Sequence, residues 1–364
     1  MRKTHLVGAL IMSVALALTG CAAGRPAARR AAGGTLAWTD DQGVSVRRPD
    51  GRTERLAGKT PSGLRWSPDG RELAWLTDDG DADGARRAHL LEVATGEEST
   101  WTGGFHRAAI GFTDGGLLAL GPGGLVNLLV PGSRPRSRPT SLHVTEPPPE
   151  GLGAVPDGLL VAMSEVVSPH GGPQSIYLVA PDGRTRRLVD GADDEADLGN
   201  VPISSPAVLP GTVAFATGGS DGHCTRSDQV QLMDVITGRM TATGMPRPVT
   251  TGRGWGVRSL AWGRDGVLTA VLVDTPIDGS CTPAPLTPSV WRLERGAWAQ
   301  GDEHGLRAAY GPRGQLALVT GQVTDEGEET GRRELLLVDG AGGRKVLGEG
   351  VRELAWSLAD DGRR

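Results

Sequence analysis

Short apolar segments separated by glycine turns recur along most of the chain. In these segments apolar residues alternate with polar ones or run together briefly, which is typical of β-strands rather than helices. One set of turn glycines lies between such segments at intervals of 42 to 55 residues. These glycines are Gly70, Gly116, Gly158, Gly211, Gly266, Gly314 and Gly362. The interval is typical of a propeller blade built from four antiparallel strands.

A second set of glycine turns is an independent check on the first. Each follows an apolar strand, such as Val44 to Arg48 or Leu335 to Val338, as expected for the hairpin between the third and fourth strands of a blade. The turn glycines are Gly51, Gly96, Gly132, Gly183, Gly238, Gly296 and Gly342. Seven turns of each kind predict an all-β fold, a seven-bladed β-propeller. An open two-sheet sandwich is the alternative, although sandwiches lack such a regular doublet of turns.

The two ends of the repeat region complement each other. Residues 35 to 41 match residues 72 to 79, the second strand of a unit, and no first strand precedes them. Val351 to Ser357 match the first strand at Leu64 to Ser67, and no second strand follows them. We therefore expect the C-terminal strand to join the N-terminal blade and close the ring, which removes exposed sheet edges.

The segment WSPDGRELA, from Trp66 to Ala74, resembles the WD40-like repeat of TolB-type propellers. The resemblance implies that Asp69 and Gly70 form a tight turn and that Trp66 packs between blades. It spans residues 35 to 357, but the match is close only at Leu64 to Gly104. TolB itself has six blades behind an α/β domain, and this sequence has neither feature. The resemblance therefore implies the fold and not the Tol-Pal role.

The N-terminus has the pattern of an export signal. Arg2 and Lys3 precede an apolar stretch from Leu6 to Leu18, which is too short to span a bilayer comfortably. The sequence LTGC that ends at Cys21 resembles the lipobox of bacterial lipoprotein precursors. The resemblance implies cleavage before Cys21 and a diacylglyceryl group on its thiol. An ordinary secretory signal with a chance cysteine is the alternative.

These features predict three regions. Residues 1–20 form a signal peptide, residues 21–34 a lipidated tether, and residues 35–364 the seven-bladed propeller. The tether contains three arginines that would lie beside anionic headgroups. The expected location is the extracytoplasmic face of the bacterial cell membrane, with the membrane contacted through the lipid anchor.

Composition and charge narrow the possible partners. The 364 residues include 56 Gly and 25 Pro, which weaken helix interiors and disfavour an all-helical fold. The formal net charge is -5 and the isoelectric point about 5.9, so the chain as a whole does not attract polyanions. A nucleic-acid partner is therefore not predicted.

Long connections gather on one face of the predicted propeller, because turns between second and third strands share a face with the inter-blade connections. They are residues 77–87, 141–151, 164–174, 190–202, 218–229, 274–289 and 320–334. Long loops on a rigid scaffold often carry binding sites, and we expect binding there. The alternative is that they are tolerated insertions, since lengthening a loop costs little free energy.

Cys224 and Cys281 occupy equivalent long connections in neighbouring predicted blades. A disulfide between them is the prediction for an oxidising compartment. A thiol nucleophile or a metal pair is the alternative. His223 is the histidine that adjoins either cysteine, and no histidine is spaced like a zinc ligand.

Candidate catalytic and metal motifs are weak. Residues 218–222, GGSDG, match the G-x-S-x-G nucleophile elbow, but they lie between predicted strands with no helix to follow. Asp79, Asp81 and Asp83 open a calcium-type loop whose twelfth position is Leu90 rather than Glu, so they are weak metal candidates. We predict no catalytic residue, no metal and no cofactor.

Arginines recur in three of the predicted first strands, at Arg65, Arg258 and Arg352. They either bind an anion in the central channel or cap the channel wall. The function predicted from the whole pattern is a non-enzymatic binding or scaffold module for a protein, peptide or glycan at the cell envelope. The alternative is a propeller enzyme of the lactonase or hydrolase type, with a metal or an anion in the channel.

Overall fold

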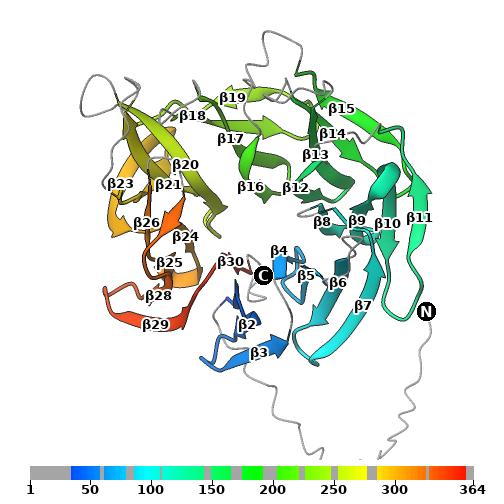
Figure 1. Ribbon diagram of the computed structural model, residues 1–364, viewed down its shortest axis with the longest axis horizontal. Helices are drawn as coiled ribbons and strands as arrows, with labels where there is room; N and C mark the ends of the chain where they lie inside the picture. Colours follow the sequence, from blue (N-terminus) through cyan, green and yellow to red (C-terminus); the bar gives the residue numbers. More distant parts are fainter. Residues whose placement is uncertain are drawn as a thin grey trace, which may run out of the picture. The chain divides into compact units, whose positions relative to one another are not determined.

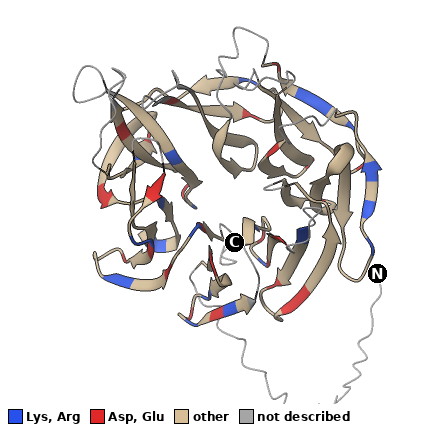
Figure 2. Ribbon diagram, in the orientation of Figure 1, with Lys and Arg blue, Asp and Glu red and all other residues tan. Residues whose placement is uncertain are grey.

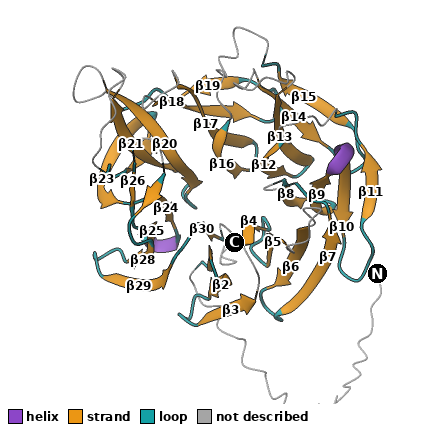
Figure 3. Cartoon of the chain, viewed as in Figure 1, coloured by secondary structure: helices purple, strands orange, loops and turns teal. Residues whose placement is uncertain are grey.

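A computed structural model of the chain contains seven four-stranded antiparallel sheets in a ring (Figure 1). It describes residues 34–57, 61–78, 86–106, 109–142, 149–164, 174–191, 203–220, 226–246, 253–276, 285–324 and 328–357. In this part of the chain the elements are strands and two short 3-10 turns, Pro122–Gly124 and Pro312–Gly314 (Figure 3). The predicted all-β, seven-bladed propeller is confirmed.

The sheets are named blades 1 to 7, and each blade has its strands ordered from the innermost outward. Blade 1 contains β30 (Glu353–Trp356), β1 (Leu36–Asp40), β2 (Gly43–Arg47) and β3 (Thr53–Ala57). Blade 2 contains β4 (Pro61–Trp66), β5 (Glu72–Asp78), β6 (Arg86–Glu92) and β7 (Glu97–Gly103). Blade 3 contains β8 (Ile110–Thr113), β9 (Gly116–Gly121), β10 (Leu125–Leu129) and β11 (Arg136–Pro139). Blade 4 contains β12 (Glu150–Val155), β13 (Gly158–Ser164), β14 (Gln174–Val179) and β15 (Thr185–Val189).

The remaining three blades follow in chain order. Blade 5 contains β16 (Ser204–Leu209), β17 (Thr212–Ser220), β18 (Arg226–Asp234) and β19 (Met240–Ala242). Blade 6 contains β20 (Arg253–Trp262), β21 (Leu268–Pro276), β22 (Ser289–Glu294) and β23 (Ala297–His304). Blade 7 contains β24 (Arg307–Tyr310), β25 (Leu316–Val319), β28 (Glu334–Val338) and β29 (Arg344–Glu349). A separate two-stranded hairpin, β26 (Gln322–Val323) with β27 (Glu329–Thr330), is inserted between β25 and β28.

The ring closes through the two ends of the propeller sequence. Strand β30 pairs with β1 in antiparallel register, with Leu36 opposite Trp356 and Thr39 opposite Glu353. Strand β30 also contacts β24 of blade 7 and β4 of blade 2, so each innermost strand touches the next around the ring. The C-terminal strand therefore completes the N-terminal blade, as the sequence predicts.

All the described turn glycines except Gly158 have a positive φ, the conformation that favours glycine in tight turns. All seven glycines of the second set have a positive φ, between 70° and 90°. In the first set Gly70 has a φ of 67°, and its N–H donates to the Ser67 carbonyl at 2.8 Å. Asp69 accepts from the Ser67 hydroxyl at 2.7 Å and from the Arg71 N–H at 3.1 Å. This turn joins β4 to β5 because Asp and Gly satisfy its backbone groups locally. Gly362 lies outside the described residues.

Tryptophans at the ends of innermost strands bond across the blade interfaces. The Trp66 indole N–H donates to the Ala355 carbonyl of blade 1 at 3.1 Å. Trp356 donates to Ala309 of blade 7 at 2.9 Å, and Trp262 donates to Ala207 of blade 5 at 3.1 Å. A repeated tryptophan thus fixes one blade to the preceding blade at three interfaces.

The hydrophobic core is divided among the blade interfaces. Within the described residues, each of the seven interfaces has its own cluster of buried side chains. Phe215 of blade 5, for example, is fully buried in the cluster shared with blade 4, and Trp75 of blade 2 in the cluster shared with blade 1. Because each of these clusters is shared by two blades, each blade depends on its neighbours for the burial of its apolar surface.

The hairpin β26–β27 connects blade 7 to blade 6. Val323 exchanges two backbone hydrogen bonds with Leu286, at 2.7 and 2.9 Å. Below this bridge, Val323 packs with Val273 of blade 6 and Leu306, which precedes β24. The hairpin leaves the propeller on the face of the long connections, because it joins a second strand to a third.

Candidate functional site

Several predicted site residues lie outside the described residues. They are Cys21, Cys224, Cys281, Asp79, Asp81 and Asp83. Lipidation, the disulfide and the weak calcium loop therefore stay predictions. In the part of the chain that is described, no group of three or more His, Cys, Asp or Glu side chains is arranged to hold a metal ion. Those residues also form no helix with the length and hydropathy needed to cross a membrane.

The strands of blades 5 and 6 extend furthest toward the long-connection face. Strands β17 and β18 pair along nine residues to Ser220 opposite Arg226, and β20 and β21 pair from Trp262 to Arg253. Gly218, Gly219 and Ser220 of the GGSDG motif are therefore part of a β-ladder. A nucleophile elbow needs a sharp strand-to-helix turn, so these residues do not have its geometry.

A buried polar contact joins the long strands of these two blades, and further contacts hold β20 within blade 6. The Asp228 carboxylate of β18, 2% exposed, accepts the Val257 N–H of β20 at 2.7 Å. Trp255 packs edge-on against Trp291, with ring centroids 5.5 Å apart, and its indole N–H donates to the Pro246 carbonyl at 2.5 Å. These contacts fix β20, which carries the first residue of the candidate site.

Four charged side chains meet where β20, β24 and the inserted hairpin approach one another. We call Arg258, Arg307, Arg333 and Glu329 the arginine cluster. Arg307 Nη2 donates to Glu329 Oε1 at 2.7 Å. Arg258 Nη2 lies 3.6 Å from Glu329 Oε1, and Arg333 Nη1 lies 3.6 Å from Glu329 Oε2. Three guanidinium groups therefore surround one carboxylate.

Local backbone structure positions the members of the arginine cluster. The register of β20 shifts between Val257 and Ser259, and this β-bulge contains Arg258. The Ser205 hydroxyl of blade 5 donates to the Arg258 carbonyl at 3.1 Å. Bulges re-aim side chains at the ends and rims of sheets. Glu329 is brought opposite by the hairpin, where it pairs with Val323.

The cluster is partly removed from solvent and carries excess positive charge. The side chains of Arg258, Glu329, Arg307 and Arg333 are 17%, 20%, 26% and 28% exposed. Burial by itself would raise the pKa of the Glu329 carboxyl. The hydrogen bond from Arg307 and the charges of the three arginines outweigh burial, so this pKa lies below its ordinary value. Glu329 is therefore ionised at neutral pH, and the cluster has a net charge of about +2 because arginine stays protonated.

The three arginines singled out in the sequence do not share one partner. Arg258 joins the arginine cluster, whereas Arg352 pairs with Asp41. Arg65 donates to the Leu64 carbonyl at 3.0 Å; burial lowers its pKa, and the charge of Glu353 opposes that effect. The three arginines therefore have separate partners among the described residues.

Sequence reasoning missed Arg307, Arg333 and Glu329. Arg307 begins the innermost strand of blade 7, and Glu329 lies in the long connection of residues 320–334. The signal present in the sequence was EETGRR in that connection, where a carboxylate precedes two arginines. Nothing in the repeat pattern relates it to Arg258, 71 residues away.

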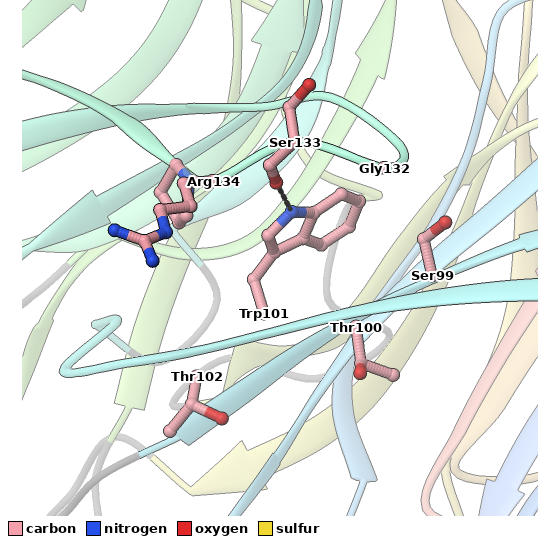
Figure 4. Close-up of a pocket in the computed structure, with 8 residues that line it drawn as sticks. Ser99, Thr100, Trp101, Thr102, Gly132, Ser133 and Arg134 are labelled. Atoms are coloured by element: carbon pink, nitrogen blue, oxygen red, sulfur yellow. Dashed lines mark hydrogen bonds between the residues drawn. The ribbon is translucent and has the colours of Figure 1, made fainter.

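Other basic residues lie on the outer rim. Figure 2 shows basic segments on β11 and β15, and Arg136 and Arg138 there are exposed to solvent. A shallow groove of about 470 Å³ adjoins β7 and the turn before β11, and Figure 4 shows its lining by Trp101, Ser133 and their neighbours. The Trp101 indole N–H donates to the Ser133 carbonyl at 2.9 Å, a contact that joins blades 2 and 3. This groove is part of the blade packing rather than of the arginine cluster.

Comparison with known proteins supports the fold. No family model matches the chain, and no curated protein matches its sequence. A putative 6-phosphogluconolactonase from Bacteroides uniformis has a TM-score of 0.52 at 12% identity, over 89% of this chain and 99% of that one. The corresponding protein from Bacteroides fragilis has a TM-score of 0.51 at 11% identity, over 89% and 98%.

A third similar structure is the β-propeller domain of the Trilobed protease from Pyrococcus furiosus. It has a TM-score of 0.50 at 12% identity, over 87% of this chain and 94% of that one, and is described as having an open velcro topology. In the present chain the pairing of β1 with β30 closes the ring. Identities this low show a shared propeller fold and carry no activity from one protein to another.

Proposed function

We propose that this protein is a lipid-anchored, extracytoplasmic lipoprotein whose TolB-like propeller is a non-enzymatic binding module for a protein, peptide or glycan at the cell envelope. The observation that carries the proposal is the arginine cluster on the long-connection face. A ring that presents charged, partly buried side chains from neighbouring blades is the kind of surface that propellers use for binding. The LTGC sequence ending at Cys21 supports the anchor.

The chemistry of the cluster favours binding over catalysis. Arginine does not lose its proton in proteins, so it orients and neutralises anionic groups but does not serve as a general base. Glu329, with its lowered pKa, is a weak proton acceptor at neutral pH. The side chains of the cluster are thus suited to hold an acidic group of a partner.

The test is the capture of binding partners in membranes prepared from cells that express the full chain. Wild-type protein is cross-linked in place and compared with Arg258→Gln/Arg333→Gln and with a control, Arg332→Gln. Arg332 is the sequence neighbour of Arg333, but it is exposed and pairs with Glu334 and Glu349 instead. We expect the double variant to lose cross-linked partners that the wild type and the control retain. The same partner set on all three proteins would refute the proposed binding face.

The same preparation tests the anchor. The intact mass is expected to correspond to a chain that begins at Cys21 and carries a diacylglyceryl group. Alkylation of Cys224 and Cys281 only after reduction would establish the predicted disulfide. An unlipidated chain, or thiols that react without reduction, would contradict the respective prediction.

A further inference from the structure

We propose that the arginine cluster is a phosphate-binding site and that Glu329 is its internal occupant, which a phosphate group of the ligand replaces. The inference deepens the proposed function and rests on it only for the location of the site on the binding face. The ligand class is a phosphate monoester, free or attached to a larger molecule. Three features of the cluster lead to this assignment: its hydrogen bonding, its charge and the attachment of Glu329.

The hydrogen bonding of Glu329 is incomplete for a carboxylate among three guanidinium groups. Among the described side chains, Arg307 is the one that donates a hydrogen bond to it. Arg258 and Arg333, at 3.6 Å, are within ion-pair distance but beyond hydrogen-bond distance. A phosphate group has a third acceptor oxygen, and it therefore offers acceptors in three directions where the carboxylate offers two.

A buried donor of Arg307, the residue that bonds to Glu329, also lacks an acceptor. Arg307 Nη1 exposes less than 1 Å² and has no hydrogen-bond partner among the described residues. An unsatisfied buried polar group costs about 1–3 kcal/mol, so such groups in a folded protein indicate a missing partner. This nitrogen belongs to the guanidinium group that already donates to Glu329, where the incoming oxyanion would bind.

The charge of the cluster matches a dianion. Within these four partly buried side chains, three positive groups and one negative group leave an excess of two charges, and partial burial reduces solvent screening. A phosphate monoester carries close to two negative charges at neutral pH. If it replaces Glu329, the residual charge falls to about +1, and the displaced carboxylate regains solvent. A monocarboxylate ligand would leave the excess unchanged.

The attachment of Glu329 allows this exchange. Strand β27 has two residues and pairs only with β26 among the described strands, so Glu329 is not part of a four-stranded blade. Arg258 and Arg307, by contrast, lie on innermost strands of the ring. Rotation of the Glu329 side chain therefore opens the site while Arg258 and Arg307 stay in position.

The experiment is isothermal titration of the full chain with inorganic phosphate at pH 8, with acetate as the comparison anion. We expect phosphate to bind more tightly than acetate. Glu329→Gln removes the competing carboxylate and is expected to bind phosphate at least tenfold more tightly than wild type. Arg307→Gln is expected to bind it at least tenfold more weakly, and Arg332→Gln to bind it as wild type does.

The outcomes separate the site from nonspecific binding. Equal phosphate affinity in all four proteins, or weaker binding by Glu329→Gln with unchanged thermal unfolding, would overturn the proposal. The Glu329→Gln result stands even if Arg307→Gln does not fold. Loss of partner capture without any phosphate binding would refute this inference and leave the proposed function in place.

A second pair of probes identifies the source of the phosphate. Glucose 6-phosphate represents a free phosphorylated ligand, and vesicles of phosphatidylcholine with phosphatidic acid represent a lipid headgroup. Binding of either probe that is strengthened by Glu329→Gln supports the site and assigns its source. Binding of neither probe, together with no binding of inorganic phosphate, would overturn it.

Discussion

Two partly buried carboxylates of this propeller have pKa values shifted in opposite directions. Glu329 lies among three arginines, and its pKa is below the ordinary value. Glu150, at the start of innermost strand β12, is affected by burial, which raises the pKa of its carboxyl. The difference arises because burial disfavours a charge while nearby opposite charges stabilise it. At the residue scale, the surroundings and not the residue type determine whether a glutamate stabilises this fold.

Glu150→Gln is therefore expected to stabilise the protein at neutral pH. A carboxyl whose pKa is raised on folding binds protons more tightly in the folded state than in the unfolded state. Its contribution to stability is therefore fully present below the unfolded pKa, which is about 4.5. That contribution is lost as the pH rises through the folded pKa. The gain from the substitution should be largest at pH 7 and vanish below about pH 4. Urea unfolding at several pH values measures it.

Glu97→Gln is the matched control for this prediction. Glu97 is exposed on β7, so the substitution removes one negative charge from the chain without changing a buried group. A pH-independent difference between Glu150→Gln and wild type would contradict the argument from burial.

At the scale of single elements, closure of the ring depends on strand β30. It is four residues long, yet it supplies the innermost strand of blade 1 and contacts blades 7 and 2. Glu353 on this strand also accepts the Leu64 N–H of β4 at 3.1 Å. Strand β30 covers the inner edge of β1, so the loss of this one strand exposes that edge to other chains.

Ala355→Pro is expected to open the ring. Proline removes the N–H that a residue within a sheet contributes to the ladder, and Ala355 pairs with Ala37 in the middle of β30. We expect a loss of about 3 kcal/mol or more in the free energy of unfolding, together with self-association at high protein concentration. Urea denaturation and light scattering measure the two effects.

Ala355→Ser provides the control, because serine retains the backbone N–H. It should leave the light scattering of the protein as in wild type and cost much less stability than proline. A proline variant as stable as the serine variant would mean that β30 does not contribute to closure.

At the scale of the whole molecule, the sharing of cores between blades makes the propeller one cooperative unit. Each cluster of buried side chains belongs to two blades, and the ring of such interfaces has no free end. Removing the burial at one interface therefore affects both blades and, through them, their neighbours. Open repeat arrays differ, because their terminal units have only one neighbour.

Phe215→Ala tests this cooperativity. Phe215 is fully buried between blades 4 and 5, and its truncation is expected to cost about 3–5 kcal/mol. Calorimetry should show one transition moved to lower temperature rather than a new transition for blades 4 and 5. Val346→Ala, at a position 52% exposed, is the control and should hardly move the midpoint. Two resolved transitions would contradict the cooperative picture.

The features that the sequence predicted are those set by short-range chemistry. The alternation of apolar and polar residues defines the strands, and glycine with aspartate defines turns such as the one at Asp69 and Gly70. Regular repetition of these local signals predicted seven blades. The match of Val351 to Ser357 with a first strand predicted the pairing of β30 with β1, since only a closed ring satisfies both ends.

Only the tertiary structure brought the arginine cluster together. Arg258 was visible in the sequence, but the same reasoning grouped it with Arg65 and Arg352, which have other partners. The hairpin β26–β27 is an insertion outside the repeat, so periodicity does not place it. Its bridge to Leu286 brings Glu329 of blade 7 to Arg258 of blade 6. Periodic patterns determine backbone architecture because they reflect local geometry. Contacts between side chains of different blades depend on how insertions fold across the interface, and no local signal specifies that.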